Sequence, residues 1–141
     1  MLSILGWREW VRLPTLGTAI KAKIDTGAMT SSVHAFDLRE YVDRGCPMVE
    51  FSLHPRQRSD EFSVTAVAEI AGRRRVRSSN GRAEQRVVVV MDIALGTTAF
   101  ETEFTLTDRD AMGFRMLLGR RALRNRFVVD VSKSFLSGRR P

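Results

Sequence analysis

The chain has 141 residues, of which 43% are hydrophobic and 28% charged. This length suits one domain, and the apolar fraction supports a packed core, which argues against a disordered chain. No apolar stretch reaches the roughly 20 residues of a membrane-spanning helix, and residues 1–13 lack the features of a secretory signal. The net charge of +7 favours acidic partners. The single cysteine, Cys46, excludes an internal disulfide and fits a reducing cytoplasm, which is the expected location.

Short strands separated by turns are expected along most of the chain. Apolar and polar residues alternate through residues 20–24, 49–53 and 100–106, which predicts half-buried strands. Residues 87–91 are continuously apolar, which predicts a strand covered on both faces. The pair Asn80-Gly81 lies between extended segments and predicts the end of a hairpin.

Helix signals are weak in this sequence. A short helix is expected over residues 120–125, after Gly119, and a single turn over residues 38–42. The pattern as a whole predicts one all-β domain over residues 1–141, closed or barrel-like in form, with residues 137–141 as a frayed tail.

The segment Asp25-Thr26-Gly27-Ala28 follows the amphipathic strand at 20–24 and is a candidate catalytic turn. One carboxylate cannot be both general acid and general base on a peptide bond, but two neighbouring carboxylates share a proton and divide these roles. Because only one such segment occurs, a second copy of the chain would supply the second carboxylate across a two-fold axis. Gly27 allows a second backbone to approach closely, and the Thr26 hydroxyl is suited to tie two such turns together.

A second motif, Met116-Leu117-Leu118-Gly119-Arg120, gives the chain a resemblance to retropepsin-like aspartic proteases, which place such a segment beneath their catalytic turn. More narrowly, the chain resembles the RimB-like bacterial family, which bears the name ATP-dependent zinc protease. The matching blocks are residues 6–11, 22–35, 76–81, 117–120 and 127–132, and Met29 departs from the basic residue expected there.

The resemblance implies a retropepsin-like closed barrel, a C2 homodimer and a flap hairpin over residues 73–86 with its tip near Asn80. It implies catalysis by Asp25, an active-site turn of Thr26, Gly27 and Ala28, and a supporting loop of Leu117, Leu118 and Gly119. Some members of the family trim glutamate tails from a ribosomal protein, so a glutamylated substrate is expected on kinship alone.

The predicted hairpin is rich in arginine, the side chain best suited to bind carboxylates in a bidentate manner. The candidates for binding an acidic peptide are Arg73, Arg75, Arg77, Asn80, Arg82 and Arg86, with Arg74 in the same segment. Two alternatives stay open. One is a basic module that binds nucleic acid or the ribosome, although no recognised binding motif supports it. The other is a noncatalytic scaffold that keeps the fold.

Metal and nucleotide motifs are missing from the sequence. His34, His54 and Cys46 are the only histidines and cysteine, and neither His-Glu-x-x-His nor Cys-x-x-Cys occurs. The sequence also has no phosphate-binding loop of the Gly-x-x-x-x-Gly-Lys-Ser/Thr type. No metal and no cofactor are therefore expected.

Overall fold

The structure, a computed structural model, describes residues 2–56, 61–77, 81–108 and 113–139. Its elements are nearly all strands, as predicted. The strands are β1 (Ser3–Leu5), β2 (Arg8–Leu13), β3 (Thr18–Ile24), β4 (Ser31–His34), β5 (Phe36–Asp43), β6 (Cys46–Leu53), β7 (Val64–Arg77), β8 (Ala83–Leu95), β9 (Thr98–Thr107), β10 (Met116–Leu118) and β11 (Phe127–Val129). One short helix, α1 (Arg120–Leu123), and a 3-10 turn at Pro14–Leu16 complete the described elements.

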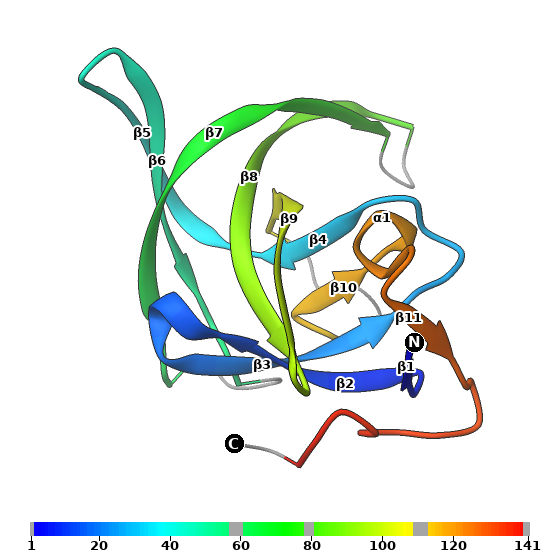
Figure 1. The fold of residues 1–141 in the computed structure, drawn as a ribbon. Coiled ribbons are helices and arrows are strands. Elements are labelled where there is room, and N and C mark those ends of the chain that lie inside the picture. The colour runs from blue at the N-terminus through cyan, green and yellow to red at the C-terminus, as the bar shows by residue number, and fades with distance from the viewer. Residues whose placement is uncertain (1, 57–60, 78–80, 109–112, 140–141) are drawn as a thin grey trace.

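Six of these strands form a closed barrel, which confirms the predicted retropepsin-like architecture. Their order is β2-β3-β10-β4-β9-β8, and β8 returns to β2 through the pair Arg12 and Ala94. Beyond the barrel the sheet continues through β7, β6 and β5, which reach away from it (Figure 1). Closure leaves these six strands without a long open edge, which protects them from pairing with other chains.

The barrel interior is filled by every second residue of its strands, because side chains alternate between the two faces of a strand. Ile20, Ala22 and Ile24 of β3 are buried there with Phe104 of β9, whereas Phe100 of β9 is only partly buried. Every intervening residue therefore lies on the outer face of the barrel. The continuously apolar run of β8 is covered on its outer face at Val88, which is 4% exposed, but Val90 is 41% exposed, so the prediction of two covered faces fails at that residue.

β7 and β8 form the hairpin predicted around Asn80-Gly81, and in Figure 1 both strands curve strongly along their length. Their register shifts between Ile70 and Gly72, which marks a β-bulge. The far end of the hairpin, residues 78–80, lies outside the described residues, so Asn80 itself is not placed.

Two predictions about helices are corrected by the structure. The expected helical turn at residues 38–42 is wrong, because these residues belong to β5, which pairs with β6 through a turn at Arg44 and Gly45. Both turn residues have positive φ, at 52° and 79°, a geometry that suits a tight hairpin. The helix expected at 120–125 is shorter, since α1 ends at Leu123 and Asn125 has a φ of 67°.

A buried carboxylate, Glu9, ties the C-terminal segment to β2. Its Oε2 accepts hydrogen bonds from the backbone N–H groups of Gly6 at 2.6 Å and Leu136 at 2.9 Å. Its Oε1 accepts from the N–H of Ser137 at 2.9 Å and from the Ser137 hydroxyl at 2.7 Å. Ser137, the first residue of the tail that was expected to fray, is thus held in place.

Glu9→Gln is expected to lower the free energy of unfolding by about 2–3 kcal/mol, because the amide NH2 would face N–H donors and leave them unsatisfied. Chemical denaturation measures the change. Glu101→Gln is the matched control, since Glu101 is exposed on β9, and it should leave stability within about 0.5 kcal/mol. Equal stability of the two variants would contradict this role of Glu9.

Candidate active site

Asp25 directly follows β3, and the alternation of that strand places its side chain on the outer face of the barrel. Ile24 is buried inside the barrel, whereas Lys23 and Asp25 are half-buried on the other face. The next two residues, Thr26 and Gly27, are exposed. The carboxylate is therefore presented at the molecular surface from the end of a rigid strand.

The turn after Asp25 is held by its own hydrogen bonds. The N–H of Gly27 donates to Asp25 Oδ1 at 2.9 Å, and the N–H of Ala28 donates to the Asp25 carbonyl at 3.2 Å. The first of these bonds fixes the orientation of the carboxylate and leaves Oδ2 outside that contact. This is the arrangement expected of a group that must present one oxygen to a reacting molecule.

The segment from β10 into α1 supports the turn from the interior. β10 lies between β3 and β4, parallel to β3 and antiparallel to β4, and Leu118 accepts a hydrogen bond from the N–H of Asp25 at 2.8 Å. Gly119 packs so closely that a Cβ there would lie 2.5 Å from the carbonyl oxygen of Thr30. The predicted supporting residues and the predicted catalytic turn are thus brought together, while Leu117 faces outward beside Lys23.

Two residues that the sequence reasoning did not single out complete the support. The buried Ser31 hydroxyl accepts the N–H of Gly119 at 3.0 Å, and the Arg120 guanidinium donates to the Thr26 carbonyl at 2.9 Å. Ser31 lies in the polar run after the turn, and Arg120 follows Gly119 directly, so their positions in the two motifs were the available signal.

A row of side chains runs across the outer face from Asp25 toward the hairpin. Lys23 is in register with Leu117, Leu117 with Ser32, and Ser32 with Thr105. The Thr105 hydroxyl in turn accepts a hydrogen bond from Arg74 of the hairpin at 3.2 Å. Residues in register share a face, so Arg74 and Asp25 lie on the same face of the sheet.

The structure divides the hairpin arginines between two faces. Arg73, Arg75 and Arg77 alternate with Arg74 and therefore lie on the face opposite to it. Arg73 forms a bidentate ion pair with Glu40 of β5, and this hydrogen bonding holds the pKa of Glu40 below its ordinary value. Arg82 is exposed near the hairpin end.

Among the predicted substrate-binding residues, Arg73 and Arg86 are already engaged by carboxylates of this chain. Arg86 lies opposite Arg74 in the hairpin and pairs with Glu84 at 2.7 Å. The hairpin arginines therefore do not form one uniform patch.

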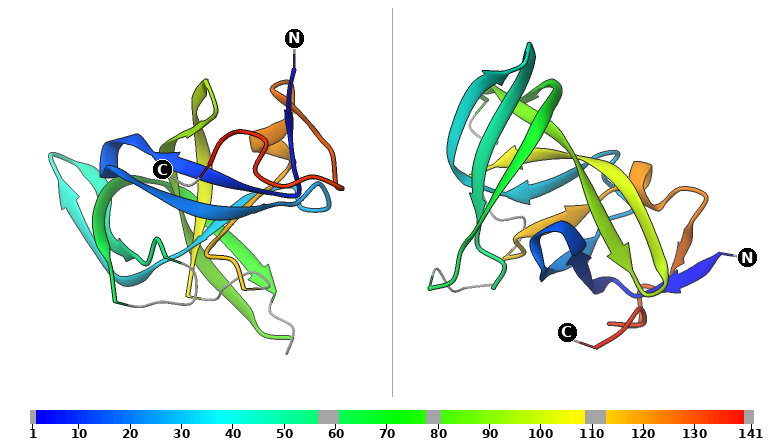
Figure 2. Two further views of the ribbon diagram at one scale, coloured as in Figure 1. Left: turned by 90° about the horizontal axis from the view of Figure 1, so that it is seen from below. Right: turned by 60° about the vertical axis from the view of Figure 1, so that its left-hand side comes forward.

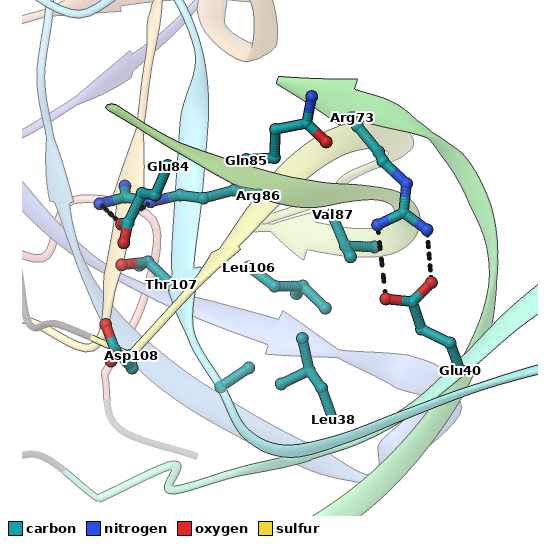
Figure 3. A pocket seen from close by; sticks show the side chains of 11 residues that line it. Leu38, Glu40, Arg73, Glu84, Gln85, Arg86, Val87, Leu106, Thr107 and Asp108 are labelled. Carbon is teal, nitrogen blue, oxygen red and sulfur yellow. Dashed lines mark hydrogen bonds and ion pairs between the residues drawn. The ribbon is translucent and has the colours of Figure 1, made fainter. Parts of the chain in front are cut away.

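An open groove of about 280 Å³ lies beside the hairpin, between β8, the end of β9 and the start of β5 (Figure 3). Leu38, Val87 and Leu106 form an apolar part of its wall, and the pairs Arg73–Glu40 and Arg86–Glu84 flank it. Asp25 does not line this groove. The groove is thus distinct from the surface around the Asp25 turn.

The two histidines lie side by side, and with the cysteine they are the candidate zinc ligands considered from the sequence. The rings of His34 and His54 stack with centroids 5.9 Å apart, and His54 Nδ1 lies 3.2 Å from the carbonyl oxygen of Phe62. Stacked rings turn their faces toward each other, whereas zinc ligands point their nitrogens at one shared metal position. Cys46 is exposed at the start of β6. Within the described ranges no three His, Cys, Asp or Glu residues gather as metal ligands would.

Within residues 2–56, 61–77, 81–108 and 113–139, no helix has the length and apolar character needed to cross a bilayer.

The closed barrel, the Asp-Thr-Gly turn and the Leu-Leu-Gly segment beneath it define the class of retropepsin-like aspartic endopeptidases. A model of the RimB-like family, described as retropepsin-like aspartic endopeptidase RimB, matches residues 4–140. The chain belongs to this family.

Several known proteins are similar to this chain. Proteins named probable alpha-L-glutamate ligase from Shewanella pealeana (strain ATCC 700345 / ANG-SQ1) and Parasynechococcus marenigrum (strain WH8102) are 48% and 40% identical to it over 136 residues. Each match covers 96% of this chain but only 30% and 29% of the two ligases. A crystal structure of a Legionella pneumophila protein of unknown function superposes with a TM-score of 0.81 at 26% identity, covering 96% of this chain and 98% of that one.

Proposed function

We propose that this protein is an aspartic peptidase that acts as a C2 homodimer, with one Asp25 from each chain. The observation that carries the proposal is the geometry of the turn, in which Asp25 is oriented by Gly27 and backed by Leu118 while it remains at the surface. Membership of the RimB-like family supports the same chemistry.

Two Asp25 carboxylates brought together would hold a single proton, because two like charges at short range cannot both ionise. The ionised carboxylate accepts a proton from a water molecule as that water attacks the scissile carbonyl carbon. The protonated carboxylate donates its proton toward the carbonyl oxygen. Collapse of the tetrahedral intermediate then transfers a proton to the leaving amine and breaks the peptide bond.

The exposed surface near the turn supports a two-fold contact. Thr26 and Gly27 are exposed, and the two-stranded sheet of β1 and β11 carries Ile4 opposite Val128, both largely exposed. Figures 1 and 2 show this sheet at the same end of the molecule as the β3–β4 turn. Apolar side chains in such a position would be covered by the same surface of a second chain.

The proposed substrate is an acidic peptide, and in particular a glutamate-tailed protein such as a glutamylated ribosomal protein, encountered in the cytoplasm. The net charge of +7 and the arginines of the hairpin favour binding of acidic chains. The relatives named probable alpha-L-glutamate ligase join a region like this one to a longer protein, which connects the region to glutamate chemistry.

Cleavage assays on a peptide with a C-terminal run of glutamates and on its glutamine counterpart test the proposal. We expect cleavage of the glutamate peptide, no effect of a metal chelator, and no product from an Asp25→Asn control. Loss of cleavage on chelation, with recovery on adding zinc, would contradict the aspartic mechanism. Salt-sensitive binding of ribosomal RNA by a protein that cleaves neither peptide would favour the nucleic-acid alternative.

A further inference from the structure

We infer that Lys23 and Arg74, which share the outer face with Asp25, determine substrate specificity by binding carboxylate side chains of the peptide. The inference rests on the proposed function and assigns its acidic preference to particular residues. It also shifts that preference away from Arg73, Arg75 and Arg77, which the sequence favoured.

Lys23 is the charged residue nearest to Asp25 along β3. It is half-buried on the outer face of the barrel, between Arg8 of β2 and Leu117 of β10 in register. A glutamate of the substrate close to the scissile bond would approach the negative charge of the Asp25 pair. A cation beside that pair offsets the repulsion, and Lys23 is placed to supply one.

Arg74 occupies the hairpin end of the same row. Its side chain is 29% exposed, and the Thr105 hydroxyl holds the guanidinium at 3.2 Å. Its ion pair with Glu103 is long, at 3.7 Å, and the Glu103 side chain is itself 51% exposed. A pair of this kind is weak in water, so a substrate carboxylate competes with it readily. Arg86, on the same face, is bound more closely by Glu84 at 2.7 Å.

The stretch of the row between the two cations carries no charge. Half-buried Ser32 and buried Thr105 lie in register there, and Leu117 lies between Ser32 and Lys23. An extended acidic peptide crossing this row meets a cation near Asp25 and another beneath the hairpin. The opposite face of the hairpin carries Arg73, paired with Glu40, and Arg75 and Arg77, which lie away from the row.

Peptide binding to the Asp25→Asn protein tests the inference without requiring cleavage. Fluorescence anisotropy gives Kd for a labelled glutamate peptide and for its glutamine counterpart, before and after a second substitution. Lys23→Met and Arg74→Gln should each reduce the preference for glutamate by about tenfold or more, because each removes a charge-assisted contact to the substrate carboxylate. Lys23→Arg and Arg74→Lys should retain most of it, which separates loss of charge from loss of fold.

Arg44→Gln is the charge-matched control, because Arg44 lies in the β5–β6 turn, remote from the β3–β4 turn in Figure 1. It should keep the preference within about twofold. Loss of preference confined to Arg75→Gln and Arg77→Gln, or no preference in the parent protein, would overturn the inference. Selective binding without any cleavage by the wild type would instead refute the proposed peptidase and leave this assignment standing.

Discussion

Replacing Asp25 with asparagine is expected to lower kcat/KM by at least about a thousandfold, because the dyad then has no carboxylate to accept a proton from water. The asparagine side-chain oxygen can still accept the Gly27 N–H, which lies 2.9 Å from Oδ1. The variant should therefore unfold at the temperature of the wild type. Peptide cleavage and thermal unfolding, measured on the same preparation, give the two results.

Mixing the two proteins tests whether one site needs two chains. With random exchange, a roughly fourfold excess of Asp25→Asn chains should reduce activity per wild-type chain to about one fifth, because most wild-type chains then have an inactive partner. The mixture needs incubation long enough for subunits to exchange. Activity per wild-type chain that does not change after exchange would show that a single Asp25 suffices.

Gly119→Ala is expected to destabilise the fold by about 2–4 kcal/mol. The added Cβ would meet backbone atoms, which cannot move aside as a flexible side chain can. The added Cβ would lie 2.5 Å from the Thr30 carbonyl oxygen and 2.8 Å from the Thr30 nitrogen. The φ of −97° at Gly119 is ordinary, so space rather than backbone conformation excludes a side chain. Displacement here would also break the support of the Asp25 turn and reduce activity in whatever protein remains folded.

Gly72→Ala is the matched control for that substitution. A Cβ at Gly72 meets no heavy atom within 4 Å, and the residue lies in β7. Alanine there should be neutral or slightly stabilising, because it reduces the freedom of the unfolded chain. A Gly119→Ala protein as stable as the Gly72→Ala protein would show that the turn can move aside at low cost.

The barrel strands were predictable because their apolar positions alternate, as at Ile20, Ala22 and Ile24 of β3. The strand β5 was missed because none of its residues is fully buried and four in a row are exposed, so it shows no sustained alternation of apolar and polar residues. Its pairing with β6 depends on a turn in which Arg44, not an asparagine or aspartate, precedes Gly45. Pairing of this kind is decided by tertiary contacts rather than by local pattern.

The candidate site was predictable as two short motifs, but not as a surface. The sequence placed Asp25 and Gly119 in separate segments, and the parallel pairing of β10 with β3 brings them together. It could not assign faces to the arginines, because the bulge between Ile70 and Gly72 changes which residues of β7 share a face with those of β8. Because of the bulge, Ile70 shares a face with Arg73 rather than with Arg74, and alternation along β7 then puts the two arginines on opposite faces.

The support of the turn by β10 has a further consequence for how the protein is made. The bond from Gly119 to Ser31 spans 88 residues, and the one from Arg120 to Thr26 spans 94. Contacts between such distant segments raise contact order and form late in folding. During synthesis, a nascent chain thus carries Asp25 long before the β10 segment that orients its backbone has emerged from the ribosome.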